Sequence, residues 1–230
     1  MYVPPLDSDS IDPLEYLANC QNIDRTKIKL IELFRLYGAG SKSKSYIELY
    51  NTIEVLIHNK KVDCIVEFGT ASGSSARALS DKYPSAKIYT IDINKANQLI
   101  FQNHPRIVPI VADQSNILDL TQIASMIPPI DLLIDDGSHM SSDILLTLKI
   151  LSSKLKSDSI YIIEDCDSVG NPAYSDHMNL RFGRSKEGNL RTDYLQMIND
   201  LMYTCDKNKN IQLMYTCKCL MILSGVYQLH

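Results

Sequence analysis

The sequence predicts an α/β protein built on a doubly wound, Rossmann-like sheet of seven mostly parallel strands. From residue 62 onwards, short apolar segments rich in β-branched residues alternate with segments of helical periodicity. An acidic residue stands at or just beyond the end of each of the first five apolar segments. Two further apolar segments near the C-terminus are separated by a tight turn, which predicts a C-terminal antiparallel strand.

The first part of the chain has mostly helical patterns, and we expect residues 1–60 to form an N-terminal helical cap on a main domain over 61–230. One helix is expected to start at Asp12 and Pro13, as N-cap and first helical residue. An apolar stripe over 28–36 predicts another, which ends near Gly38-Ala-Gly40.

The polar stretch Ser41–Ser45 is expected to be a mobile connection before a helix over Tyr46–Asn59. Two interpretations of this part remain open. Its helices can simply pack on the sheet, or the Gly/Ser/Lys connection can be a lid over a ligand.

The sheet follows from the apolar segments and their intervals. The predicted strands are Val62–Phe68, Ile88–Ile91, Ile107–Val111, Ile130–Ile134, Ile160–Ile163, Ile211–Tyr215 and Cys219–Ser224. The predicted helices between them are Ser74–Lys82, Lys95–Gln102, Ser115–Ile127 and Ser141–Leu155. An irregular segment over 166–190, typical of an active-site loop, precedes a helix over about Thr192–Thr204.

Composition excludes several classes of protein. A net charge of -4 and a pI near 5.7 argue against general binding of nucleic acid. No apolar run has the length of a membrane span, and the first residues do not resemble a signal peptide. The six cysteines lack zinc-site spacing and are expected to be reduced, buried thiols. We therefore expect a cytoplasmic protein with no membrane or nucleic-acid partner, and a homo-oligomer of undetermined size.

Acidic groups are expected to meet where two predicted strands end. Ile130–Ile134 runs directly into Asp135, Asp136, a glycine, a serine and His139. The strand that ends at Ile163 runs into Glu164 and Asp165. Neighbouring parallel strands bring such residues to one edge of the sheet, where open α/β sheets bind ligands. Crowded carboxylates repel one another, so a cation or a proton is expected among them.

A second motif predicts a ligand with an adenosine moiety. Glu67-Phe-Gly-Thr-Ala-Ser-Gly73 joins a strand end to a helix start, where glycines allow close approach and amides are free. Asp92 can accept both hydroxyls of a ribose, and Asp113-Gln114 can reach an adenine. The expected cofactor-binding residues are Glu67, Gly69, Thr70, Gly73, Ser74, Asp92, Asp113, Gln114 and Asp135.

These motifs resemble class I S-adenosylmethionine-dependent methyltransferases. More narrowly, Ile134-Asp-Asp-Gly-Ser-His139 with Tyr161-Ile-Ile-Glu-Asp165 is similar to the macrolide-sugar O-methyltransferases of the mycinamicin and macrocin pathways and to the cephalosporin hydroxylase-like group. The resemblance covers roughly residues 62–165. It implies that S-adenosylmethionine is the cofactor and that a sugar or glycosylated small molecule is the acceptor.

The resemblance also implies roles for single residues. Asp136, Glu164 and Asp165 match the family's Mg²⁺ ligands, and His139 matches its catalytic base. Mg²⁺ takes oxygen ligands and keeps positions open for a substrate hydroxyl, whose pKa it lowers. A histidine can then accept the hydroxyl proton. The other interpretation of His139 is a capping or packing role at the following helix.

Other functions remain open beside this one. A catechol-type O-methyltransferase uses the same fold and metal, but the absence of Trp and the basic loop with Arg181, Arg184 and Lys186 favour a sugar, an acidic or a phosphate-bearing acceptor. A nicotinamide-dependent oxidoreductase is disfavoured because GxGxxG is missing. A non-catalytic adenosyl-ligand binder would have no use for a base beside a metal.

Overall fold

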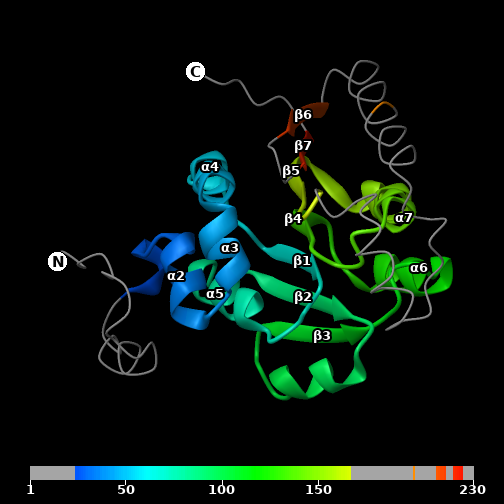
Figure 1. Cartoon of the computed structure of the whole chain (residues 1–230), viewed down its shortest axis with the longest axis horizontal. Helices are drawn as coiled ribbons and strands as arrows, with labels where there is room; N and C mark the ends of the chain where they lie inside the picture. The colour runs from blue at the N-terminus through cyan, green and yellow to red at the C-terminus, as the bar shows by residue number, and fades with distance from the viewer. Residues whose placement is uncertain (1–23, 167–198, 200–210, 216–219, 225–230) are drawn as a thin grey trace.

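The computed structural model describes residues 24–166, 199, 211–215 and 220–224, and contains a seven-stranded sheet of order β3-β2-β1-β4-β5-β7-β6 (Figure 1). Strands β1 to β5 pair in parallel, β7 is antiparallel to β5, and β6 is antiparallel to β7. The strands are β1 Cys64–Phe68, β2 Lys87–Asp92, β3 Ile107–Val111, β4 Ile130–Asp135, β5 Leu155–Ile163, β6 Ile211–Tyr215 and β7 Leu220–Ser224. The predicted Rossmann-like α/β class is confirmed.

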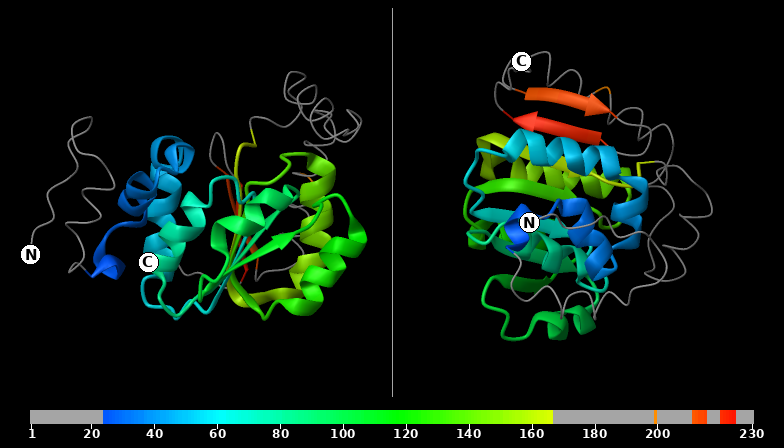
Figure 2. Two further views of the ribbon diagram at one scale, coloured as in Figure 1. Left: turned by 90° about the horizontal axis from the view of Figure 1, so that it is seen from below. Right: turned by 90° about the vertical axis from the view of Figure 1, so that its left-hand side faces the viewer.

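Helices cover both faces of the sheet (Figure 2). The α-helices are α2 Leu30–Tyr37, α3 Gly40–Ser45, α4 Ile47–Ile57, α5 Ser74–Lys82, α6 Ile117–Met126 and α7 Ser141–Leu151. The 3-10 helices are η1 Arg25–Lys27, η2 Lys95–Phe101 and η3 Ser152–Lys154. Helices α2 to α5 lie over one face and α6 and α7 over the other.

Two apolar cores result from the alternation of side chains along each strand. Ile65 and Leu132 pack with α2, α4 and α5 in one core. Their neighbours Val66 and Leu133 pack with α6 and α7 in the other. Strands β1 and β4 are therefore buried on both faces, as is typical of parallel sheets. The parallel arrangement places the ends of β1, β4 and β5 at one edge.

Several predicted boundaries were wrong by a few residues. The first strand begins at Cys64 rather than Val62, and β5 begins at Leu155 rather than Ile160, because a polar segment precedes its apolar half and the pairing with β4 is irregular there. The helix predicted over Lys95–Gln102 is 3-10 rather than α. The helix predicted over Ser141–Leu155 ends at Leu151, and η3 follows it.

The predicted mobile connection at Ser41–Ser45 was wrong, because these residues belong to helix α3. The preceding helix ends as predicted, at Gly38 in the left-handed conformation with φ 77°. Helix α3 contains a buried lysine, Lys42, and a buried serine, Ser43. Its buried face is polar, so the apolar periodicity that reveals other helices is missing here.

Other expectations lie outside the described residues. They are the helix start at Asp12 and Pro13, the loop over 167–190 with its arginines, the helix over about Thr192–Thr204, and Cys20, Cys205, Cys217 and Cys219. Cys64 and Cys166 are buried, as expected. Within the described ranges, every helix is too short or too polar to cross a lipid bilayer.

The turn after β1 depends on a glycine. Gly69 has φ +88°, and a Cβ added there would lie 2.0 Å from the backbone oxygen of Asp136.

We expect Gly69→Ala to lower the free energy of unfolding by about 3 kcal/mol or more, because a positive φ and a backbone clash combine. Urea denaturation measures the loss. Gly40→Ala is the control, since nothing lies within 4 Å of the Cβ that it adds. Equal stability of the Gly69 variant and the parent would show that the turn relaxes freely.

Candidate active site at the ends of β1, β4 and β5

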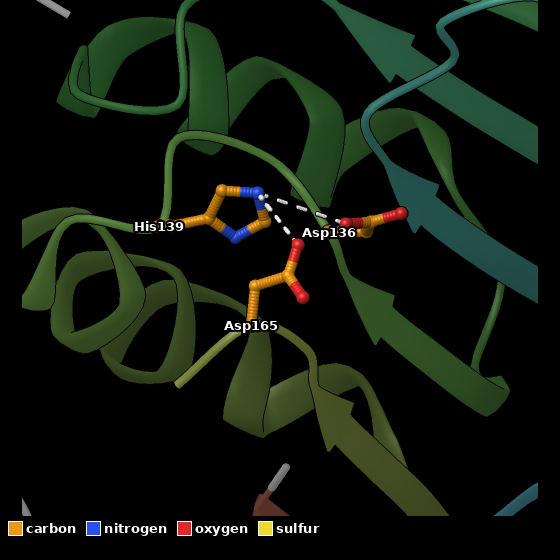
Figure 3. A group of neighbouring side chains, drawn as sticks. All are labelled: Asp136, His139 and Asp165. Atoms are coloured by element: carbon orange, nitrogen blue, oxygen red, sulfur yellow. Dashed lines mark ion pairs between the residues drawn. The ribbon is translucent and has the colours of Figure 1, made fainter. Parts of the chain in front are cut away.

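Three potential metal ligands meet at the ends of β4 and β5 (Figure 3). His139 Nε2 lies 3.7 Å from Asp136 Oδ1 and 3.6 Å from Asp165 Oδ2. One ligand atom from each of Asp136, His139 and Asp165 lies within 4.8 Å of the others. Their side chains are 21%, 11% and 36% exposed, so the group is accessible from solvent. The prediction that these two strand ends meet is confirmed for these residues.

The backbone is strained at two of these residues. His139 has φ 53° and Asp165 has φ 50°, and both are therefore in the left-handed region that non-glycine residues seldom adopt. Ala71, in the turn after β1, shares this feature with φ 45°. Such strain persists only where surrounding structure fixes it, and it is concentrated at functional sites.

A buried part of the site lies next to this group and contains the ammonium group of Lys42. Lys42 Nζ lies 2.8 Å from Asp136 Oδ2, 2.7 Å from Glu164 Oε1 and 3.7 Å from Glu67 Oε1. The side chains of Lys42, Glu67 and Glu164 are all 4% exposed or less. Asp136 therefore joins the two parts of the site: one of its oxygens faces His139 and the other faces Lys42.

Two tyrosines near Lys42 donate hydrogen bonds to acidic residues in both parts of the site. The Tyr46 hydroxyl donates a hydrogen bond to Asp165 Oδ1, and the Tyr50 hydroxyl donates one to Glu164 Oε1. Lys42 lies in α3, Tyr46 lies between α3 and α4, and Tyr50 lies in α4. These helices thus supply a row of three donors, here called the donor row, to Asp136, Glu164 and Asp165.

Burial raises the pKa of both interior glutamates. It raises the pKa of Glu67 and that of Glu164 to about 7, with the Lys42 ammonium acting in the opposite direction. Burial disfavours the charge on Lys42 as well, but Asp136 and Glu164 outweigh it and hold its pKa well above the usual range. Both oxygens of Glu67 and Oε2 of Glu164 are buried without a hydrogen-bond partner in the described part of the chain.

The buried Glu67 predicts a pH-dependent cost to stability. Its carboxyl titrates near 4.5 in the unfolded chain and near 7 in the folded protein, so the cost appears as the pH rises from 4.5 to 7. In the presence of chelator, Glu67→Gln should be more stable than the parent at pH 8, by about 2 kcal/mol, and equally stable at pH 4.5. Thermal unfolding across this range measures the difference. Glu48→Gln, on an exposed part of α4, should show none. A pH-independent effect of Glu67→Gln would contradict this prediction.

The glycine-containing turn lies beside this site. The Thr70 hydroxyl is 2.7 Å from that of Thr90, inside the protein. Gly73 has φ +76° and stands at the N-terminus of α5, where a Cβ would lie 2.4 Å from the Phe101 ring. Ser74 is the first residue of α5, and its hydroxyl lies 2.9 Å from that of Ser72.

Asp92 follows at the end of β2. Its carboxylate accepts hydrogen bonds from the amides of Ala71 at 3.1 Å and Asn94 at 2.8 Å, and from the Asn97 side chain at 2.8 Å. It thereby connects the turn after β1 to the turn after β2. The turn and Asp92 together form the edge of the sheet on the β1–β2 side of the acidic group.

Gln114 and Asp135 have partners inside the protein. Gln114 Nε2 donates to both oxygens of Asp135, at 2.8 and 2.9 Å, and its Oε1 accepts from the Ser138 amide at 2.9 Å. Asp135 also accepts a hydrogen bond from the Tyr161 hydroxyl at 2.8 Å. Burial raises the pKa of Asp135 to about 6, and these hydrogen bonds oppose that effect. The network fixes the end of β4 and the start of the loop to His139.

Asp113 follows β3, the outer strand on this side of the sheet. Its Oδ1 accepts from the amide and the hydroxyl of Ser115, at 2.8 and 2.6 Å, which shapes the turn between β3 and α6. The functional residues that the sequence analysis missed are Lys42, Tyr46, Tyr50 and Tyr161. Their only local signal is the spacing of the first three, which a search for polar helical stripes could have found.

The fold and the site define a class of protein. Residues 66–166 match the family model described as a methyltransferase domain. The MycE methyltransferase of the mycinamycin biosynthetic pathway, solved in complex with Mg, SAH and mycinamycin VI, superimposes with a TM-score of 0.68 at 20% identity, covering 96% of this chain and 64% of that one. The protein therefore has the Rossmann-like α/β methyltransferase fold.

Within that class the chain resembles enzymes that methylate sugars. It is 33% identical over 104 residues to the 8-demethyl-8-α-L-rhamnosyl tetracenomycin-C 2′-O-methyltransferase of Streptomyces olivaceus, covering 45% of this chain and 27% of that protein. It is 31% identical over 93 residues to the mycinamicin VI 2″-O-methyltransferase of Micromonospora griseorubida, covering 40% and 23%. The matched residues thus span about a quarter of these relatives. The resemblance predicted from the two strand-end motifs is confirmed.

Proposed function

We propose that the protein is a Mg²⁺-dependent O-methyltransferase that moves a methyl group from S-adenosylmethionine to a hydroxyl of a sugar or glycosylated small molecule. The observation that carries the proposal is the meeting of Asp136, His139 and Asp165 at the ends of β4 and β5. This group adjoins a glycine-containing turn with free helix amides, the kind of structure that receives a cofactor in open α/β sheets.

The donor set fits Mg²⁺. Carboxylate oxygens are the ligands that this hard ion prefers, and Asp136 and Asp165 offer them at a solvent-accessible position. Glu164 Oε2 is buried without a hydrogen-bond partner in the described residues, so a cation would satisfy it. We propose Asp136, Glu164 and Asp165 as the ligands. The ion, when bound, would lower the pKa of an acceptor hydroxyl.

The cofactor is proposed to lie along the edge formed by β1 and β2. Gly69, Thr70, Gly73 and Ser74 shape the turn that would approach it, and the exposed edge of Asp92 can accept ribose hydroxyls. Glu67, Asp113, Gln114 and Asp135 are the other residues proposed for the cofactor site. The structure pairs Glu67 with Lys42, Asp113 with Ser115 and Gln114 with Asp135. Residues 1–60 are proposed to form a cap, and three of its described residues, Lys42, Tyr46 and Tyr50, contact the acidic part of the site.

His139 is proposed as the base. Its imidazole lies between two carboxylates, which stabilise the positive charge that it gains with the proton. The acceptor oxygen forms a bond to the methyl carbon while the carbon–sulfur bond breaks, and the hydroxyl proton passes to His139. S-adenosylhomocysteine leaves with the electron pair of the broken bond. The sheet edge contributes the alignment of the two reactants, which supplies much of the rate in such a displacement.

The acceptor class rests on the resemblance. The relatives' names specify the 2′ oxygen of a rhamnosyl tetracenomycin-C and the 2″ oxygen of mycinamicin VI. The test is transfer of radiolabelled methyl from S-adenosylmethionine to a panel of rhamnosylated and deoxysugar-bearing compounds, with catechols as the comparison and with or without EDTA. Label on a glycoside that disappears with EDTA supports the proposal. Transfer only to catechols, or transfer indifferent to EDTA, contradicts it.

A further inference from the structure

The donor row contacts every proposed metal ligand. Lys42 bonds Asp136 and Glu164, Tyr46 bonds Asp165, and Tyr50 bonds Glu164. The contacts join residues far apart in sequence: Lys42 and Asp136 are separated by 94 positions, and Lys42 and Glu164 by 122. The segment from α3 into α4 therefore closes on the ligands as a unit.

Lys42 occupies one oxygen on each of two proposed metal ligands, Asp136 and Glu164. Its Nζ is 2.8 Å from Asp136 Oδ2 and 2.7 Å from Glu164 Oε1, which are the normal lengths of charge-assisted hydrogen bonds. Mg²⁺ bound to the same two oxygens would lie about 2.1 Å from each. An ammonium group and a divalent ion cannot share that space, and they repel each other. Binding of the ion through Asp136 Oδ2 and Glu164 Oε1 would therefore require that Lys42 withdraw.

Lys42 is the positive charge among a group of largely buried carboxylates. Its side chain is 4% exposed and is directed at three carboxylates, Glu67, Asp136 and Glu164. Without it, these groups would be an uncompensated buried negative cluster. Helix α3 has six residues and packs against α2 and α4. Lys44, two positions after Lys42 in the same helix, is exposed.

We propose that Lys42 is a built-in cation that holds the acidic residues together in the metal-free protein, and that divalent-ion binding displaces it and releases α3. Lys42 is a positioning residue that acts through Asp136 and Glu164. This inference rests on the proposed metal site and adds to it a coupling between metal occupancy and the conformation of the N-terminal helices. The apparent metal affinity is then lower than the intrinsic affinity, because the binding-competent state is a minority of the population.

Calorimetric titration with Mg²⁺ alone tests the displacement. Lys42→Met keeps the length of the side chain and removes the charge, and it should tighten the Mg²⁺ dissociation constant by about tenfold or more. Lys44→Met, which removes an equal charge from an exposed position of the same helix, should leave it within about twofold. In the unaltered full-length protein, Mg²⁺ should increase amide hydrogen exchange over residues 40–46, and in Lys42→Met it should not. The exchange measurement on the unaltered protein tests the displacement even if Lys42→Met does not fold.

The outcomes separate the inference from the proposed function. Tighter binding by Lys42→Met together with metal-dependent exchange in the parent supports displacement. Equal or weaker binding by that variant, or exchange over 40–46 that does not change with Mg²⁺, overturns the inference while the metal site stands. If no Mg²⁺ binds to the parent or to Lys42→Met at millimolar concentration, the proposed metal site fails and the inference fails with it.

Discussion

Asp136→Asn is expected to lower the turnover number for methyl transfer by about a thousandfold or more, while affinity for S-adenosylhomocysteine stays within about threefold. Asparagine has nearly the volume of aspartate, so the fold of the loop should persist. It lacks the negative charge that both parts of the site use, because one oxygen of Asp136 lies near His139 and the other accepts a hydrogen bond from Lys42. Radiolabel transfer and calorimetric titration with S-adenosylhomocysteine measure the two quantities.

The matched control for this variant is Asp158→Asn. Asp158 lies in β5 itself, well before the strand's end, with a side chain that is 53% exposed and paired with Lys60. Its loss should alter turnover by less than about twofold, since exposed ion pairs contribute little. Parental turnover in Asp136→Asn would remove Asp136 from the metal site. A loss of S-adenosylhomocysteine binding equal to the loss of turnover would assign it to the cofactor instead.

His139→Gln is expected to lower turnover by about a hundredfold or more, the range that general bases contribute, with the acceptor KM within about threefold. Glutamine can still donate or accept a hydrogen bond near Asp136 and Asp165, but it cannot take up a proton. The effect should therefore fall on the chemical step. The dependence of turnover on pH should also lose its acidic limb in the variant.

His58→Gln is the matched control, because His58 is exposed at the end of α4. It should behave like the parent in turnover and in pH dependence. If His139 only shaped the loop before α7, His139→Gln would lower stability and leave turnover per folded molecule nearly unchanged. That result would favour the capping or packing interpretation over the proposed base.

The sheet and the meeting of its strand ends were predictable because they follow from local patterns and one general rule. Apolar segments such as Ile130–Ile134 are visible in the sequence, and parallel neighbours must end at the same edge. Adjacent pairing of β4 and β5 then brings Asp136 close to Asp165. The apolar segments and the acidic residues after them can all be recognised within about ten residues of sequence.

The partners inside the site could not be predicted this way. Gln114 was expected to reach an adenine, whereas its amide is occupied by Asp135 and Ser138, contacts that depend on the geometry between β3 and β4. Helix α3 was missed because Lys42 meets carboxylates rather than an apolar core, and a polar stretch with glycine and serine has the composition of a loop. The spacing of Lys42, Tyr46 and Tyr50 does not reveal which buried charges they meet across the fold.

Anomalous diffraction from crystals grown with Mn²⁺ and S-adenosylhomocysteine shows whether a divalent ion binds between the ends of β4 and β5. Mn²⁺ has the ligand preferences of Mg²⁺ and is located by its anomalous signal. We expect one peak about 2.2 Å from carboxylate oxygens of Asp136, Glu164 and Asp165, with the cofactor product beside the glycine-containing turn. S-adenosylhomocysteine bound at the turn, with no peak between the ends of β4 and β5, would contradict it.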